Sequence, residues 1–205
     1  MICTLFSFTF FHLKRHFILY QNYIFANRGN CHKSAFFDNL CGMVTKVVSG
    51  AQTGVDRGAL DAAIDASCPY GGWVPKGRRS EDGCVPARYS TMSETASANY
   101  LKRTEQNVVD STATVILCHG APTGGTLRTI EFCKKHSRPY WIDDPDSPNE
   151  TERGMEIHYW IESVFGDAPI VLNFAGPRES KCPGIQESAR RYARRFLAEE
   201  PHASM

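Results

Sequence analysis

A stretch rich in small residues, from Ser49 to Arg57, has the side chains expected of a phosphate-binding loop. Gly50 and Gly54 have no side chain, so backbone can approach a ligand closely there. Ser49 or Thr53 can donate a hydroxyl, and Arg57 can add a charge-assisted hydrogen bond to a phosphate. The stretch lacks both the G-x-G-x-x-G pattern and the P-loop lysine, which excludes an ordinary dinucleotide or P-loop motif. The alternative is a tight turn without a ligand.

A second such stretch, residues 120–126, pairs Gly124 with Gly125 next to Thr126. Paired glycines flanked by threonines at the start of a helix expose backbone N–H groups that can hold a phosphate without a cation. The alternative is a plain turn in which Thr126 caps the helix. Two stretches of this kind in one small domain favour a phosphate-bearing, nucleotide-like ligand.

A basic cluster at residues 75–83 contains Lys76, Gly77 and Arg78. Its three cations stand beside two acids. The cluster could therefore clamp an anionic or sugar group, or it could be a solvated loop. The composition leaves both interpretations open.

Two further groups of polar residues could contact a ligand. Asn173 closes a predicted strand and is followed by Gly176 and Arg178, which suits recognition of a polar ligand edge. Arg103 and Asn107 are four residues apart in a helical stretch, so they share one helix face, toward either the ligand or solvent.

The spacing of apolar residues predicts an α/β domain that would bring these loops together. Short β-branched runs alternate with longer amphipathic stretches, which is the pattern of a mainly parallel central sheet flanked by helices, a Rossmann-like three-layer fold. In such sheets ligands bind outside the carboxyl ends of the strands, where helices begin. The predicted strands are residues 45–49, 72–74, 113–118, 139–142 and 169–173.

Composition is that of a soluble globular protein, because 42% of the 205 residues are hydrophobic and 22% are charged. The net charge of +1 argues against a nucleic-acid coat, so an anion must be bound by local groups. The eight cysteines form no Cys-x-x-Cys pair and have no histidine at zinc-site spacing, so we expect neither a metal site nor a disulfide framework. A reducing cytoplasm is the simplest compartment.

Residues 1–42 differ in composition from the rest of the chain. They hold eight of the twelve phenylalanines and a single acid, Asp38. They lack the order of charges and the cleavage site of a secretory signal. They also lack the uninterrupted apolar span of about 20 residues that a membrane helix needs. We expect an extension outside the fold, although an organellar presequence or an interfacial anchor would also fit. The domain would then cover residues 43–200, with a tail at 201–205.

Five segments, taken in order, resemble the family labelled as molybdenum carriers, also described as the circularly permuted YpsA branch of the SLOG superfamily. The resemblance covers residues 46–198, with Ala51 where a second glycine is expected. It implies a Rossmann-like fold and a ligand of the nucleotide or pterin-phosphate type, and it makes a carrier of molybdenum cofactor the leading function. The five segments are residues 49–61, 72–78, 103–108, 123–126 and 173–180.

The same resemblance raises an enzymatic alternative, because wider relatives include phosphoribohydrolases that cut nucleoside monophosphates at the N-glycosidic bond. The acid that such an enzyme needs would be Asp56, Glu94 or Glu131. The motif typical of these hydrolases is Gly-Gly-x-Gly-Thr-x-x-Glu, in which the acid lies three residues after the threonine. Here Glu131 lies five residues after Thr126, which weakens this alternative. Asp56 could instead be an acid that stabilises the first turn of a helix, and Glu94 could cap a helix.

A third alternative is single-stranded nucleic-acid binding through the arginine-rich last helix, which would be steeply salt-dependent. A solvated face is the favoured interpretation of those arginines, which are Arg190, Arg191, Arg194 and Arg195.

The loops and the resemblance together define the ligand-binding residues that we expect. We expect the protein to bind a phosphorylated small molecule, either a nucleotide or molybdenum cofactor, and not a membrane. We also expect it to form a homo-oligomer, either a dimer or a tetramer. The residues are Ser49, Gly50, Gln52, Thr53, Gly54, Arg57, Lys76, Gly77, Arg78, Arg103, Asn107, Gly124, Gly125, Thr126, Asn173, Gly176 and Arg178.

Overall fold

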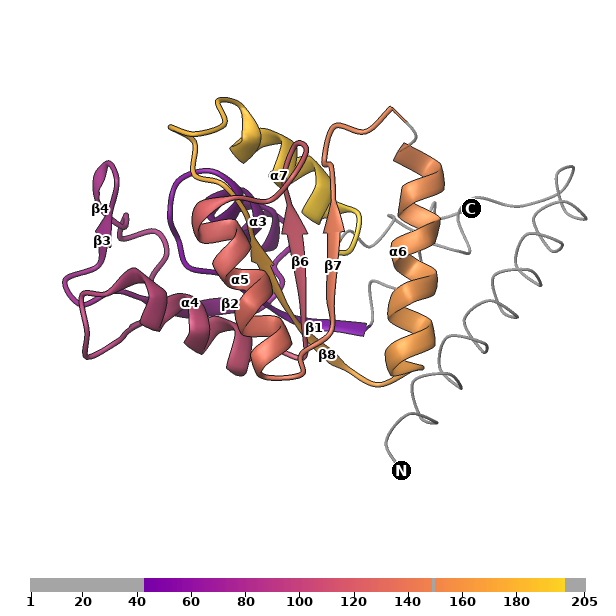
Figure 1. Cartoon of the computed structure of the whole chain (residues 1–205), viewed down its shortest axis with the longest axis horizontal. Coiled ribbons are helices and arrows are strands. Elements are labelled where there is room, and N and C mark those ends of the chain that lie inside the picture. The colour runs from indigo at the N-terminus through magenta and orange to yellow at the C-terminus, as the bar shows by residue number, and fades with distance from the viewer. Residues whose placement is uncertain (1–42, 149, 198–205) are drawn as a thin grey trace, which may run out of the picture. The chain divides into compact units, whose positions relative to one another are not determined.

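A parallel sheet lies at the centre of the domain in the computed structural model, which describes residues 43–148 and 150–197 (Figure 1). Within these residues the sheet has six strands in the order β5-β2-β1-β8-β6-β7, and every neighbouring pair is parallel. The strands are β1 (Val44–Val48), β2 (Tyr70–Val74), β5 (Met92–Glu94), β6 (Ala113–Leu117), β7 (Tyr140–Asp143) and β8 (Ile170–Ala175).

Helices connect most of these strands, and a short antiparallel hairpin follows β2. The hairpin consists of β3 (Arg79–Ser80) and β4 (Gly83–Cys84). The helices of the described ranges are α3 (Val55–Asp65), α4 (Tyr100–Val109), α5 (Gly124–Lys135), α6 (Glu150–Phe165) and α7 (Ile185–Arg194).

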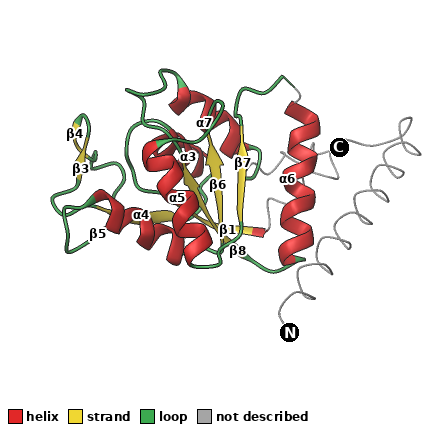
Figure 2. Cartoon of the chain, viewed as in Figure 1, coloured by secondary structure: helices red, strands yellow, loops and turns green. Residues whose placement is uncertain are grey.

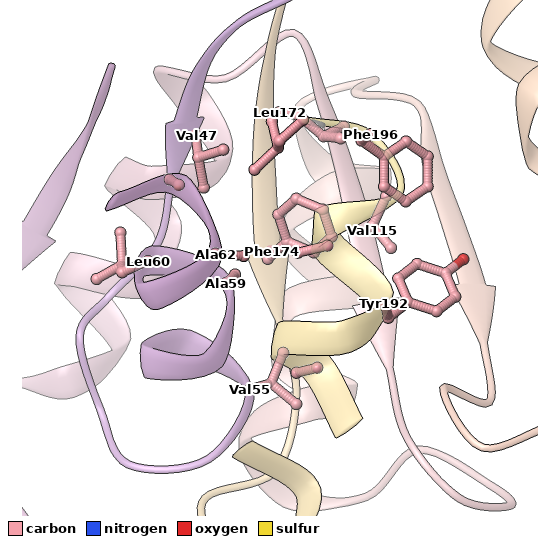
Figure 3. Packing of buried hydrophobic residues seen from close by; sticks show 14 of the residues in the cluster. Val47, Val55, Ala59, Leu60, Ala62, Val115, Leu172, Phe174, Tyr192 and Phe196 are labelled. Carbon is pink, nitrogen blue, oxygen red and sulfur yellow. The ribbon is translucent and has the colours of Figure 1, made fainter. Parts of the chain in front are cut away.

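Both faces of the sheet are buried. On one face, strand residues such as Val47 and Leu172 pack with side chains of α3 and α7 (Figure 3). Val48 and Ile116 point to the opposite face, because successive strand residues alternate, and they are also buried. On the helical layers, α3 packs against α7, and α4 packs against α5. Strands buried on both faces are typical of parallel sheets between helices, so the predicted Rossmann-like three-layer fold is confirmed.

One strand of the sheet was not predicted from the sequence. Met92–Glu94 forms β5, which pairs with β2 from Gly72↔Met92 to Val74↔Glu94. The strand is three residues long and only Met92 is buried, so it has no apolar run to reveal it. Glu94 therefore ends an edge strand and does not cap a helix. The other five predicted strands are present, with ends shifted by one or two residues.

The ends of the chain lie outside the described residues, so the expectations for residues 1–42 and 201–205 stay predictions. Among the helices that the structure does describe, none has the length and apolar character needed to cross a bilayer.

The position of β8 brings distant loops together. The chain passes from β1 to β2 on one side and from β6 to β7 on the other, and β8 then returns between β1 and β6. Because the sheet is parallel, the carboxyl ends of β1, β8 and β6 lie at one edge. Figure 2 shows this edge at β6 and at its neighbour β7, whose loops leave the sheet on the same side. The loops after β1, β8 and β6 are therefore neighbours.

We expect Leu172→Ala to lower the free energy of unfolding by about 2–5 kcal/mol, because the side chain is fully buried in a central strand and its loss leaves a cavity. Urea denaturation followed by circular dichroism measures the change. Leu127→Ala is the matched control, since Leu127 is 43% exposed on α5 and its change should stay below about 1 kcal/mol. Equal losses in the two variants would contradict the assigned core.

Candidate functional site

A cavity of about 110 Å³ opens at the edge where β1 and β8 end. This is the place where open α/β sheets bind ligands, because loops and helix N-termini converge there. Its walls come from the first loop and the start of α3, from α4 and α5, and from the end of β8 and the segment that follows it. The lining residues are Gln52, Asp56, Tyr100, Leu101, Arg103, Thr104, Asn107, Gly125, Thr129, Asn173, Phe174, Ala175, Gly176 and Arg178.

A buried ion pair between Asp56 and Arg103 forms one wall. Asp56 Oδ2 lies 3.0 Å from Arg103 Nη1, and the two side chains are 7% and 12% exposed. The same oxygen accepts a hydrogen bond from the backbone N–H of Gln52 at 3.3 Å. A Cβ on Gly50 would lie 1.5 Å from Arg103 Nη1. Gly50 therefore leaves space for the Arg103 guanidinium.

The side chain of Gln52 has its oxygen bound and its nitrogen unpaired. Gln52 Oε1 accepts hydrogen bonds from the backbone N–H groups of Thr53 at 3.1 Å and Glu81 at 2.9 Å. Gln52 Nε2 is buried and finds no partner among the described residues. Arg103 Nε is also buried, and within the same ranges it has no acceptor. Buried N–H donors are rarely left unpaired, so these two donors call for an acceptor from outside the chain.

Arg57 is occupied by the hairpin and does not line the cavity. Its guanidinium binds Asp82 through two hydrogen bonds of 2.6 and 2.9 Å, and its Nε donates to the carbonyl oxygen of Ala51. The hydrogen bond from Arg57 and a second one from Ser80 lower the pKa of Asp82 from 3.8 to about 2. This pair fastens the β3–β4 hairpin to the first loop.

Glu81, at the tip of the same hairpin, joins two loops. Its carboxylate accepts hydrogen bonds from the hydroxyls of Thr53 and Ser180 and from the backbone N–H of Ser180. Arg178 Nη1 lies 3.6 Å from Glu81 Oε2. These hydrogen bonds lower the pKa of Glu81 against the opposing effect of burial. Thr53 is thus held inside this network and lies outside the cavity lining.

Gly54 also serves close packing of loops. A Cβ there would lie 2.4 Å from the carbonyl oxygen of Pro177, and φ is +82°. Ser49 donates its hydroxyl to the carbonyl oxygen of Phe174 at 2.8 Å, which joins the ends of β1 and β8. Neither residue faces the cavity.

Two asparagines that were predicted to contact the ligand line the cavity, and their side chains form hydrogen bonds with other residues of the chain. Asn107 accepts from the backbone N–H of Trp73 at 2.7 Å and donates to its carbonyl oxygen, which holds α4 against β2. Asn173 Nδ2 donates to the hydroxyl of Thr114 at 3.2 Å. Both side chains are buried.

The cations of the basic cluster at residues 75–83 do not line the cavity. Lys76 is exposed. Gly77 donates its backbone N–H to Glu94 Oε2 at 2.6 Å, and Arg78 donates to the carbonyl oxygens of Pro86 and Tyr89. These contacts shape the loop between β2 and β5.

At the start of α5, one of three predicted residues lines the cavity. Gly125 does so, whereas Gly124 has φ +52° and open space around its α-carbon. Thr123 is the N-cap residue, without a capping hydrogen bond from its side chain, and Thr126 is buried within the first turn and is not the cap. Glu131, farther along α5, is paired with Arg128 at 2.6 Å on the surface.

The sequence analysis missed Tyr100, Leu101 and Thr129, which also line the cavity. A signal for Tyr100 was present. Asn99 is the N-cap of α4 and accepts from the backbone N–H of Leu101 at 2.9 Å. A helix starting there puts Tyr100 on the same face as Arg103 and Asn107, because residues three, four and seven apart share a helix face.

Comparison with known proteins agrees with this architecture. A family model described as the circularly permutated YpsA SLOG family matches residues 47–197. The chain belongs to the circularly permutated YpsA SLOG family. It is also similar to a crystal structure from Syntrophus aciditrophicus SB, described as a "putative molybdenum carrier protein", with 42% sequence identity and a TM-score of 0.71. The match covers 77% of this chain and 97% of that chain. Curated proteins give no match.

The Arg57–Asp82 pair predicts a pH-dependent stability. The pKa of Asp82 is lower in the folded chain than its ordinary value, so its contribution is complete above about pH 4 and is lost as the pH falls through about 2. Asp82 is 45% exposed, so we expect about 1 kcal/mol in total. Urea denaturation at about pH 6 and about pH 2.5 should show the difference between wild type and Asp82→Asn shrinking at the lower pH. A difference that does not change with pH would contradict the assignment.

Proposed function

We propose that the protein binds a phosphorylated small molecule of the nucleotide or pterin type in this cavity, as a binding or carrier protein. The observation that carries the proposal is the pair of buried donors, Gln52 Nε2 and Arg103 Nε, which have no acceptor in the described part of the chain. Leaving a donor buried and unpaired costs about 1–3 kcal/mol. A ligand oxygen would recover this cost.

The other groups around the cavity suit an anionic ligand. Gly125 lies in the first turn of α5, where unpaired N–H groups and the helix dipole favour negative charge. Arg178 lies at the rim with its side chain 43% exposed, and its ion pair with Glu81 is long enough to be exchanged for a ligand phosphate.

The size of the cavity supports a ligand that is only partly enclosed. Pockets for whole drug-sized ligands have volumes of about 300–1,000 Å³. The present cavity, at about 110 Å³, would enclose one functional group of a nucleotide or pterin. The remainder would lie over the rim, where Tyr100 and the 41% exposed Leu101 offer an apolar surface.

The name of the similar bacterial protein suggests one specific ligand. That protein is described as a "putative molybdenum carrier protein". One form in which molybdenum can be carried is the molybdenum cofactor, a pterin that bears a phosphate. We therefore include molybdopterin among the candidate ligands and treat the molybdenum as cargo. Among the described residues, no group of three His, Cys, Asp or Glu side chains could hold a metal ion itself.

Hydrolysis of a nucleoside monophosphate is the second candidate. Of the three acids proposed for it, Asp56 lines the cavity, while Glu94 and Glu131 do not. Asp56 is already bound to Arg103 and to the Gln52 backbone, which leaves it poorly placed to activate water. Release of free base by the wild type, abolished in Asp56→Asn, would establish the enzyme in place of the carrier.

Nucleic-acid binding through α7 has less support. Arg190 and Arg194 both contact Asp65, and Arg191 contacts Asp146. Because these arginines are paired with acids of the same chain, little net charge is left for a phosphate backbone.

Isothermal titration calorimetry against nucleoside mono-, di- and triphosphates and molybdopterin tests the proposal. We expect saturable binding of at least one of them at a single site. Absence of saturable binding by every compound, with the protein folded by circular dichroism, would rule the proposal out.

We expect Gly50→Ala to weaken that binding by about tenfold, because its Cβ would displace the Arg103 guanidinium from Asp56. Stability should also fall, because the Asp56 carboxylate would stay buried without its partner, so circular dichroism must first show that the variant is folded. The control is the same substitution in an Arg103→Ala background, where it should have no further effect. Independent losses in the two variants would show that Gly50 acts in another way.

A further inference from the structure

We propose that the inner end of this cavity is a seat for a tetrahedral oxyanion, formed by the side chains of Gln52 and Arg103. The oxyanion is either the phosphate ester of an organic ligand or a free inorganic ion such as phosphate or molybdate. The inference rests on the proposed function and deepens it, because it names the atoms that recognise the anionic group. We call these two side chains the oxyanion seat.

The first part of the seat is a donor that nothing in the described chain satisfies. Gln52 is only 6% exposed, lines the cavity, and its Nε2 has no partner there. A buried amide nitrogen makes hydrogen bonds in nearly all proteins, so its unpaired state marks a place for an acceptor. An amide N–H can donate only, and hence the missing group is a hydrogen-bond acceptor, such as an oxygen of an oxyanion, rather than an N–H or a cation.

The orientation of that donor is set by the hairpin. Gln52 Oε1 is held by two backbone N–H groups, from Thr53 and from Glu81 in the hairpin. Turning the amide over would place its NH₂ against both donors, so Nε2 is kept on the other side. The hairpin is itself fastened to the first loop by the Arg57–Asp82 pair. The β3–β4 hairpin is therefore a positioning element for Gln52.

The second part of the seat is Arg103, which is fixed next to Gln52. Asp56 Oδ2 binds both Arg103 Nη1 and the backbone N–H of Gln52, so the two residues meet at one oxygen. The bare α-carbon of Gly50 lets the guanidinium reach this position. Arg103 Nε remains without an acceptor among the described residues.

The arrangement suits a tetrahedral anion better than a planar one. Gln52 comes from the first loop, Arg103 from α4, and Gly125 lines the cavity from the first turn of α5. Donors from three separate elements can each meet a different oxygen of a tetrahedral group, whereas a carboxylate presents its oxygens in one plane. Because Asp56 already balances Arg103, recognition relies on directed N–H donors more than on net charge.

The test uses the full chain and Gln52→Glu, which keeps the shape and the oxygen acceptor of Gln52 but replaces the donor nitrogen by a second oxygen. Binding of inorganic phosphate, molybdate, adenosine monophosphate and adenosine is measured by calorimetry, with thermal shift as a check of folding. We expect the wild type to bind phosphate-bearing compounds better than adenosine, and Gln52→Glu to weaken their binding at least about tenfold.

Asn99→Asp is the matched control, because it adds the same charge at an exposed residue beside the cavity and keeps the oxygen that caps α4. Its binding should stay within about twofold of wild type. Competition by inorganic phosphate or molybdate would identify free oxyanions as ligands, and binding confined to adenosine monophosphate would identify the ester. Both results support the seat.

Two outcomes separate this inference from the proposed function. If the nucleotide binds and Gln52→Glu binds it equally well, the seat is wrong while the proposed function stands. If no compound binds the folded wild type, the proposed function is wrong, and the oxyanion seat that rests on it is wrong as well. A measurement without a variant covers the case in which Gln52→Glu does not fold: the side-chain amide resonance of Gln52 in NMR should shift on titration with adenosine monophosphate or phosphate, and an unchanged resonance at saturation overturns the seat.

Discussion

The pairing of β8 between β1 and β6 is the constraint on which the site depends, because it joins loops that are more than a hundred residues apart in the chain. Leu172 pairs with Val47 on one side and with Ala113 on the other. At the carboxyl end of this trio, the Ser49 hydroxyl binds the Phe174 carbonyl. The first loop and the segment after β8 can then share one cavity, and burial of β8 on both faces makes this arrangement the stable one.

The glycines of the first loop act mainly through the protein's own packing. Gly54 lets the segment after β8 approach closely, and Gly50 makes room for Arg103. Arg57 was predicted from the sequence to bind a phosphate, but its guanidinium forms an ion pair with Asp82 of the hairpin. In the proposed site, the anion is therefore bound by two side chains, Gln52 and Arg103, rather than by Arg57 and the backbone of the first loop. A loop of this kind differs physically from a P-loop, where backbone N–H groups surround the phosphate.

The cavity carries a local cost in the absence of ligand. Most buried polar groups of the described chain are paired, as Asn107, Asn173 and Asp56 illustrate. Unpaired donors at Gln52 and Arg103 stand out against this background. Natural sequences depart from full hydrogen bonding chiefly at functional sites, which is why these two donors support the proposed binding function.

The sequence by itself determined the layer architecture, because β-branched runs and helical stripes are local patterns that burial on a sheet requires. It also predicted that a ligand would bind at the carboxyl ends of the strands, and of the residues predicted to contact it, Gln52, Arg103, Gly125 and Arg178 are among those that line the cavity there. Only the tertiary structure decided which of the candidates face it. Whether Arg57 meets a ligand or Asp82 depends on a hairpin 25 residues away, and β5 forms because β2 offers it an edge. Such choices are made by partners distant in the chain, and no local spacing encodes them.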